Sequence, residues 1–154
     1  MPGCVSYVDN PLVREVIGRA IEVHRTLGPG LLESAYQRCL VWELSRTNRR
    51  FDVEVIQPVR YKGVDIDCSY RLDLVVEDEL LVEVKSVERL LPVHYAQVLT
   101  YLRLSRLRQG LLINFNVTLL KDGIKSILGP IRHEDGLIHA VDATQAASLA
   151  AGVS

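Results

Sequence analysis

The sequence has few cysteines, and the three present are widely spaced: Cys4, Cys39 and Cys68. Three is an odd number, and no CxxC pair or Cys/His cluster occurs, so the sequence predicts neither a disulfide framework nor a structural zinc site. It also lacks an apolar run of the ~18 residues that a membrane-spanning helix needs. The first residues, MPGCVSYVDN, lack the basic start and apolar block of a secretory signal. We therefore expect a cytoplasmic protein without a membrane partner.

The sequence lacks a large excess of charge of either sign, because its net charge is −1 and its isoelectric point is near 6.4. The overall charge therefore gives no sign of a basic surface that would attract nucleic acid. Basic residues do gather locally, at Arg46, Arg49, Arg50, Arg103, Arg106 and Arg108. Two interpretations stay open for them, solvated helix ends and contacts with phosphates. A Gly-rich phosphate loop is also missing, which argues against a small phosphate ester or nucleotide as the substrate.

What is present is an ordinary globular composition over 154 residues, with 48% hydrophobic and 24% charged residues. Hydrophobic periodicity predicts helices over residues 11–27, 31–48 and 92–104. It predicts strands over 51–62 (with an irregularity at Pro58), 70–76, 80–87 and 111–117. Residues 119–131 add a further strand or turn, and residues from about 140 to 154 form a short helix or a frayed tail. The order predicts a mixed sheet covered by helices.

The hairpin over residues 70–87 carries the most informative pattern. If its turn centres on Asp78, one face is apolar and pairs Leu72 with Val84, Leu74 with Val82, and Val76 with Leu80. The other face pairs Asp73 with Glu83, Arg71 with Lys85, and Val75 with Leu81. Glu83 and Lys85 share a side in any register, because strand side chains alternate.

Carboxylates that face each other across two strands repel, and burial among apolar neighbours adds a desolvation cost. A bound divalent cation removes both objections, since Mg²⁺ prefers a few carboxylate oxygens together with water and phosphate oxygens. The ammonium of Lys85 would then orient or help to deprotonate an attacking water, or stabilise charge on phosphorus. The alternative is a solvated acidic hairpin in which Lys85 balances Glu83.

Two predicted helices supply further candidates. Gln97 and Tyr101 lie four residues apart and share a helix face. Glu33 and Tyr36 lie three apart on the second helix, where Glu33 also suits the helix dipole. The tyrosines are either core-edge aromatics or substrate contacts. His94 stands near a helix start, as a surface histidine or as a group that reaches the site.

The segment Gly30-Leu31-Leu32-Glu33-Ser34-Ala35-Tyr36 matches the GxxExxY signature. The chain resembles the small bacterial and archaeal family named after that signature. The resemblance continues through HRTLGPGLLESAY, YRLDLVVEDELLVEVKSVERLLPVHYAQVLTYLRL and GLLINFNVTLLKDGIKSI. It therefore covers roughly residues 11–128, and several motifs occur in the right order.

That family is placed in the PD-(D/E)xK nuclease superfamily. The resemblance implies an α/β, restriction-endonuclease-like fold with an αβββαβ core, a mixed central sheet and flanking helices. It implies one domain over residues 1–154, with Asp73 and the Glu83-Val84-Lys85 triplet as the metal-binding and catalytic motif. Gln97 and Tyr101 resemble the QxxxY helix motif of the exonuclease branch. Glu33 resembles an extra helical carboxylate of the metal shell, whereas Leu72 replaces the proline of the superfamily's name.

The leading hypothesis is a Mg²⁺- or Mn²⁺-dependent nuclease that hydrolyses phosphodiester bonds of DNA, with RNA not excluded, by metal-activated water. The alternative is a catalytically weak module on the same fold that binds nucleic acid or a protein. A homodimer is left open. The candidate residues are Asp73, Glu83, Lys85 and Gln97 for catalysis, Glu33, Asp73 and Glu83 for the metal, and Tyr101, Tyr36 and His94 for substrate binding or support.

Overall fold

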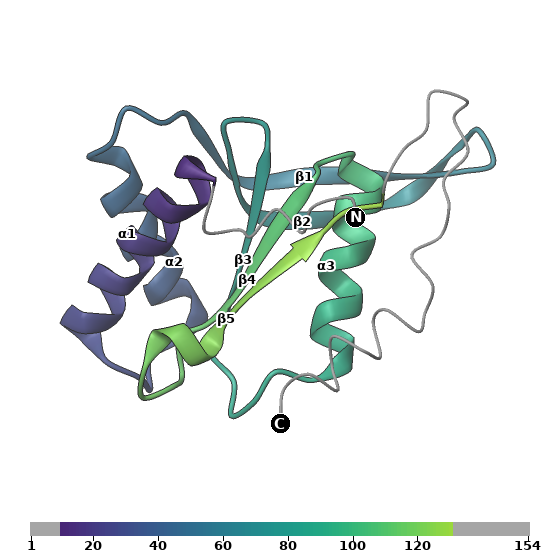
Figure 1. Cartoon of the computed structure of the whole chain (residues 1–154). Helices are drawn as coiled ribbons and strands as arrows, with labels where there is room; N and C mark the ends of the chain where they lie inside the picture. The colour runs from purple at the N-terminus through teal and green to yellow at the C-terminus, as the bar shows by residue number, and fades with distance from the viewer. Residues whose placement is uncertain (1–9, 131–154) are drawn as a thin grey trace, which may run out of the picture.

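The computed structural model describes residues 10–130 and contains three α-helices and five strands (Figure 1). In chain order these are α1 (Pro11–Leu27), α2 (Glu33–Ser45), β1 (Phe51–Tyr61), β2 (Val64–Val76), β3 (Leu80–Lys85), α3 (Pro92–Ser105), β4 (Gln109–Asn114), the short 3₁₀ helix η2 (Leu120–Gly123) and β5 (Ile124–Leu128). The predicted order of helices and strands is confirmed. The order contains the αβββαβ core that the resemblance implies, in a mixed sheet flanked by helices.

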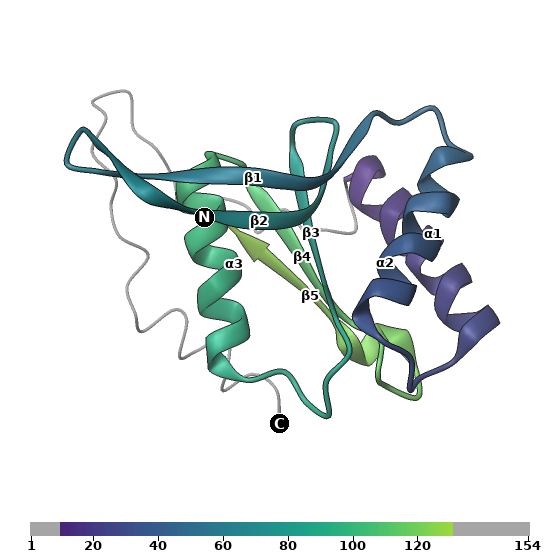
Figure 2. The same cartoon turned by 180° about the vertical axis from the view of Figure 1, so that it is seen from behind.

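The strands form one mixed sheet in the order β1-β2-β3-β4-β5. Only β3 and β4 are parallel, and α3 is the crossover that connects them. Helices α1 and α2 cover one face of the sheet, and α3 covers the other (Figures 1 and 2). Each face has its own apolar core, because successive residues of β3 and β4 point to opposite sides. Leu111 and Ile113, for example, pack toward α1 and α2, whereas Leu112 packs toward α3.

Helix α1 begins and ends as its sequence predicts. The side chain of Asn10 accepts a hydrogen bond from the backbone N–H of Leu12 at 3.0 Å, and Pro11 occupies the first turn. Gly28 ends the helix with φ 69°, a conformation that glycine adopts at little cost. Helix α2 is shorter than predicted, since it begins at Glu33 rather than near Leu31.

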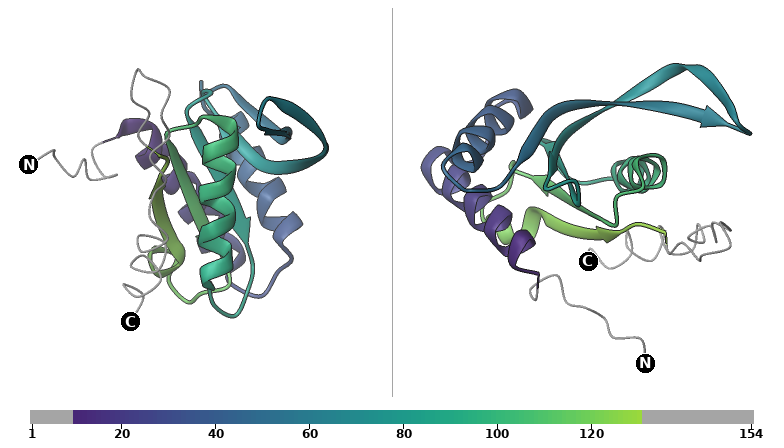
Figure 3. Two further views of the ribbon diagram at one scale, coloured as in Figure 1. Left: turned by 90° about the vertical axis from the view of Figure 1, so that its right-hand side faces the viewer. Right: turned by 90° about the horizontal axis from the view of Figure 1, so that it is seen from above.

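The β1–β2 hairpin extends well beyond the rest of the sheet (Figure 3). Strand β2 begins at Val64, six residues before the predicted start, and its residues from 64 to 71 are all exposed. We call residues 56–71 the arm. Its register shifts between Pro58 and Val59, which confirms the predicted irregularity at Pro58. A strand exposed on both sides lacks the alternation that sequence reasoning detects, so the prediction missed half of β2.

The register predicted for the β2–β3 hairpin is confirmed near the turn and wrong farther from it. Val76 pairs with Leu80, and Leu74 pairs with Val82. The ladder ends there, so Leu72 does not pair with Val84 and packs in the core beneath α3. The predicted apolar face is therefore broken after Leu74.

Strand β2 instead leaves β3 and stays paired with β1. Arg71 pairs with Ile56 rather than with Lys85, and its guanidinium lies 3.5 Å from the carboxylate of Glu54. Glu54 has φ 53°, and it stands where Asp73 would pair with β1 if the ladder were unbroken. The bend in β2 is therefore located at Asp73.

Several predictions fall outside the described residues. The helix or tail predicted for about 140–154, the first nine residues and Cys4 belong to this group. The single domain over residues 1–154 stays a prediction. Between residues 10 and 130, no helix is long and apolar enough to cross a membrane.

Candidate active site

The carboxyl groups of Asp73 and Glu83 meet where the β2–β3 ladder ends. Asp73 Oδ2 accepts a hydrogen bond from the backbone N–H of Val84 at 2.9 Å. Glu83 Oε1 accepts one from the backbone N–H of Asp73 at 3.2 Å. Each carboxylate thus takes the place of a carbonyl that a continued ladder would supply. The two acids lie next to each other because the strands part at this point.

Burial and mutual repulsion make this pair hard to ionise fully. The Glu83 side chain is almost inaccessible, at 4% exposure. Burial, together with the neighbouring charge of Asp73, raises the pKa of Glu83 to about 8. Burial also raises the pKa of Asp73, against the lowering effect of its hydrogen bond from Val84. Without a cation, the pair therefore holds a proton at neutral pH.

Lys85 lies at the end of β3 on the side of the pair. It is half-buried, and its positive charge lowers the pKa of both carboxyl groups, although less than burial raises them. Its backbone carbonyl accepts a hydrogen bond from Phe115 N–H at 2.9 Å, which links the ends of β3 and β4. The structure therefore brings Asp73, Glu83 and Lys85 close together at the point where β2 and β3 separate, as predicted.

Sequence reasoning missed Asn114, which fixes the loop after Lys85. This side chain is buried, accepts a hydrogen bond from Val87 N–H at 3.0 Å and donates one to the Val87 carbonyl at 2.9 Å. It also accepts from Asn116 N–H at 3.2 Å. The available signal was its position at the end of the apolar run LLIN. A side-chain amide buried there needs hydrogen-bond partners, and the nearby backbone can supply them.

Tyr36 anchors the loop that leads into α2. It is fully buried, and its ring stacks on Phe115 with centroids 4.5 Å apart. Its hydroxyl donates to the Gly28 carbonyl at 2.5 Å and accepts from Leu31 N–H at 3.1 Å. The residue therefore supports the loop from the inside. A direct substrate contact, one of the two roles predicted for it, does not suit a side chain with no exposed surface.

This loop brings α2 to the carboxylate pair. Ser86 donates its hydroxyl to the Leu31 carbonyl at 2.5 Å, and Gln37 donates to the Asp73 carbonyl at 3.2 Å. Glu33 in the first turn of α2 is exposed, and its charge helps to raise the pKa of Asp73. Glu33 thus borders the pair.

Helix α3 supplies three of the predicted residues. His94 accepts a hydrogen bond from Leu91 N–H through Nδ1 at 2.9 Å, so it caps the helix. Burial lowers its pKa, and the charge of Lys85 acts in the same direction. Gln97 is half-buried and lies one turn before Tyr101. His94, Gln97 and Tyr101 therefore follow one side of α3, at spacings of three and four residues.

Tyr101 lies between the carboxylates and the arm. Burial raises the pKa of its hydroxyl, and the charges of Glu83 and Asp73 add to this effect. Its ring contacts that of Tyr70 at 5.3 Å between centroids, with the planes tilted by 50°. Tyr70 is 42% exposed and had no signal in the sequence, because its contact depends on the curvature of the arm.

The donor set suits a hard divalent cation. Within residues 10–130, no group of three His, Cys, Asp or Glu side chains is arranged to hold a metal ion. Mg²⁺, however, is commonly held by one or two carboxylates, with water and phosphate oxygens as its remaining ligands. Asp73 and Glu83 are such a pair, and a cation would replace the proton that burial imposes on them.

A protein-family model of the PD-(D/E)XK nuclease superfamily matches residues 10–127. The match spans the carboxylate pair, Lys85 and the candidate residues of α2 and α3. Searches of the curated proteins and of the solved structures returned no significant match. Nucleases of this superfamily generally use divalent metal ions. A family model that covers most of the chain, together with the fold and the Asp73, Glu83 and Lys85 geometry, shows that the chain belongs to the PD-(D/E)XK nuclease superfamily.

Proposed function

We propose that the chain is a Mg²⁺- or Mn²⁺-dependent nuclease that hydrolyses phosphodiester bonds of DNA, with RNA as the second substrate to test. The observation that carries the proposal is the pair of buried carboxylates beside Lys85. A buried acidic pair is costly to maintain, and perturbed carboxyl groups of this kind gather at functional sites. The narrower GxxExxY family and a cytoplasmic location stay predictions.

Asp73 and Glu83 would hold the cation, and Glu33 would reach it through water. A divalent cation in such a site stabilises negative charge on the phosphoryl group and makes a bound water more acidic. Lys85 would orient the attacking water and stabilise charge that develops on the phosphate. Asn114 would keep Lys85 in place, because it ties the next loop to β4.

Helix α3 and the arm would contact the substrate strand. Tyr101 lies near the carboxylates, Gln97 lies one turn before it on α3, and Tyr70 extends the aromatic surface toward solvent. Aromatic side chains stack on bases with little sequence preference, at about 1–3 kcal/mol per base. His94 would contribute as a neutral group near Lys85, because its pKa lies below its ordinary value.

A second candidate is a module that binds nucleic acid or a protein without efficient catalysis. Two observations favour it: Glu83 is only 4% exposed, and the net charge of −1 gives little general attraction to a polyanion. Such a protein would use the same surface without turnover.

Cleavage assays separate these candidates. The full chain would be incubated with linear duplex, circular duplex and single-stranded DNA, and with RNA, in the presence of Mg²⁺, Mn²⁺ or a chelator. We expect Asp73→Asn, Glu83→Gln and Lys85→Ala to lower cleavage by on the order of a hundredfold or more. Glu79→Gln, an exposed acid in the turn of the same hairpin, is the matched control and should cleave like wild type.

Two results would contradict the nuclease proposal. The first is cleavage that survives both Asp73→Asn and Lys85→Ala, which would indicate a contaminating enzyme. The second is no cleavage of any substrate with either metal. A mobility shift with nucleic acid in that second case would support the binding module instead.

A further inference from the structure

Helices α1 and α2 form a groove on the side that faces away from the sheet. Over Gly18 it widens to a hollow of about 600 Å³. A smaller, more apolar hollow of about 210 Å³ lies beside it and is lined by Val23, Leu27 and Cys39 among others. Trp42 and Glu43 line both hollows, so the two are adjacent. The surface therefore carries a large aromatic side chain directly beside an apolar recess.

Trp42 is the only tryptophan of the chain and is 59% exposed. The guanidinium carbon of Arg46 lies 5.5 Å from the ring centroid, which holds the indole in place. The indole does not pack into either core. Tryptophan and arginine are enriched among the residues that dominate protein interfaces.

Gly18 stands in the middle of α1, where glycine lowers helix stability relative to alanine. It is exposed, and apart from its chain neighbours and the backbone of its own helix no described heavy atom lies within 4 Å of the position that a Cβ would occupy. The packing of the described residues therefore gives no reason for a glycine here. Its effect is to keep the groove open beside Trp42.

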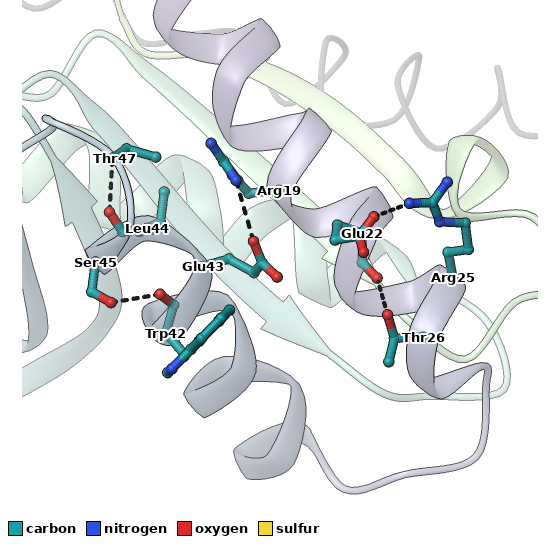
Figure 4. Close-up of polar contacts among 9 residues, drawn as sticks. All are labelled: Arg19, Glu22, Arg25, Thr26, Trp42, Glu43, Leu44, Ser45 and Thr47. Atoms are coloured by element: carbon teal, nitrogen blue, oxygen red, sulfur yellow. Dashed lines mark hydrogen bonds and ion pairs between the residues drawn. The ribbon is translucent and has the colours of Figure 1, made fainter.

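The charged residues around the groove are balanced and paired (Figure 4). Arg19 lies 3.4 Å from Glu43 across the two helices, and Arg25 pairs with Glu22. Along α1 the signs alternate at Glu15, Arg19, Glu22 and Arg25. An even mixture of both signs on one face can meet an identical face without net repulsion, and it is unsuited to a polyanion.

We propose that this groove binds a second copy of the chain, with Trp42 of each copy inserted into the apolar hollow of the other. A twofold axis makes such a contact reciprocal, because the same surface supplies both the knob and the recess. Alternating charges along antiparallel α1 helices complement each other in the same arrangement. The exposed indole, the open recess beside it and the mixed charges around them are therefore all consistent with a second copy of the chain as the partner.

The dimer would leave the candidate active site free. Trp42 lies near the end of α2, more than two turns from Glu33 at its beginning, and the groove lies on the opposite side of the sheet from α3. The inference is independent of the proposed nuclease function, since it concerns surfaces that the chemistry does not use.

Because Trp42 is the sole tryptophan, its emission reports on this surface alone. We would measure sedimentation equilibrium and tryptophan emission of the full chain from micromolar to near-millimolar concentration. We expect a monomer–dimer equilibrium together with a blue shift as the concentration rises. Trp42→Ala and Gly18→Arg should each weaken the dimer by on the order of thirtyfold or more. Gly18→Arg has open space around it, so the monomer should fold normally.

Ile56→Ala on the arm, an exposed apolar residue outside the groove, is the matched control and should dimerise like wild type. Circular dichroism would verify that each variant is folded. A chain that stays monomeric throughout would overturn the proposal, whether or not another protein occupies the groove. A dimer that survives either groove substitution would overturn it as well, since the contact would then lie elsewhere.

Discussion

The buried carboxylate of Glu83 predicts a loss of stability as the pH rises. Its pKa is about 8 in the folded chain, against an ordinary value of 4.5. A group whose pKa is raised on folding stabilises the folded state fully below the unfolded pKa, and this contribution disappears as the pH rises through the folded pKa. Since each pKa unit corresponds to about 1.4 kcal/mol, the loss between those limits is on the order of 5 kcal/mol. This exceeds a third of the stability of a typical domain.

The Glu83→Gln variant isolates this effect. An amide cannot titrate, and its oxygen can still accept the hydrogen bond from Asp73 N–H. Urea unfolding of both metal-free proteins should give similar free energies near about pH 5, and the variant should become progressively more stable toward about pH 8. At the higher pH, Mg²⁺ should raise the free energy of unfolding of the wild-type protein, because a ligand that binds the folded state stabilises it.

If the difference between wild type and Glu83→Gln stayed constant across this pH range, the carboxylate would not hold a raised pKa. The account of the pair as a proton-holding site that a cation relieves would then be wrong. Asp78→Asn, an exposed acid of the same hairpin, is the control and should show no such difference.

Three further substitutions test individual contacts. Tyr36→Phe removes a hydroxyl that bonds Gly28 and Leu31, so urea unfolding should show a loss of about 1–3 kcal/mol, and an unchanged midpoint would contradict the anchoring role. Asn114→Ala should cost a similar amount and also lower the cleavage rate, whereas a rate unchanged in folded protein would show that Lys85 needs no such support. The Tyr95 hydroxyl is buried with no hydrogen-bond partner among the described residues, so Tyr95→Phe should leave the calorimetric melting temperature equal or higher, and a marked drop would reveal a hidden partner.

The sequence was sufficient to predict the order of the elements and the register next to the hairpin turn. Both depend on local rules, namely hydrophobic periodicity and the two-residue alternation of strands. The register failed at Leu72, because β2 follows β1 away from β3. At that point Glu54 has a positive φ and Leu72 packs against α3, and neither feature can be read from the hairpin sequence.

The candidate site was predictable in its acids and its lysine, and less so in its supports. Alternation places Glu83 and Lys85 on the same side of β3, and the hairpin brings Asp73 close to them, although the exact contact of the two acids depends on where the ladder ends. The roles of Asn114 and Tyr70 depend on contacts with segments far along the chain. For Tyr36, burial decided between the two roles that spacing had left open.

The bend at Asp73 divides β2 into two parts with different surroundings. From Leu74 to Val76 the strand is buried and paired on both sides, whereas residues 64–71 have only β1 as a neighbour in the sheet. Amide hydrogen exchange should therefore follow a steep gradient along this single strand, slow in its last residues and fast in the arm. Asp73 lies at the boundary, and its carboxylate is hydrogen-bonded to Val84 in the buried strand β3. We therefore expect the arm to open locally at a lower free energy than the segment that holds the acid.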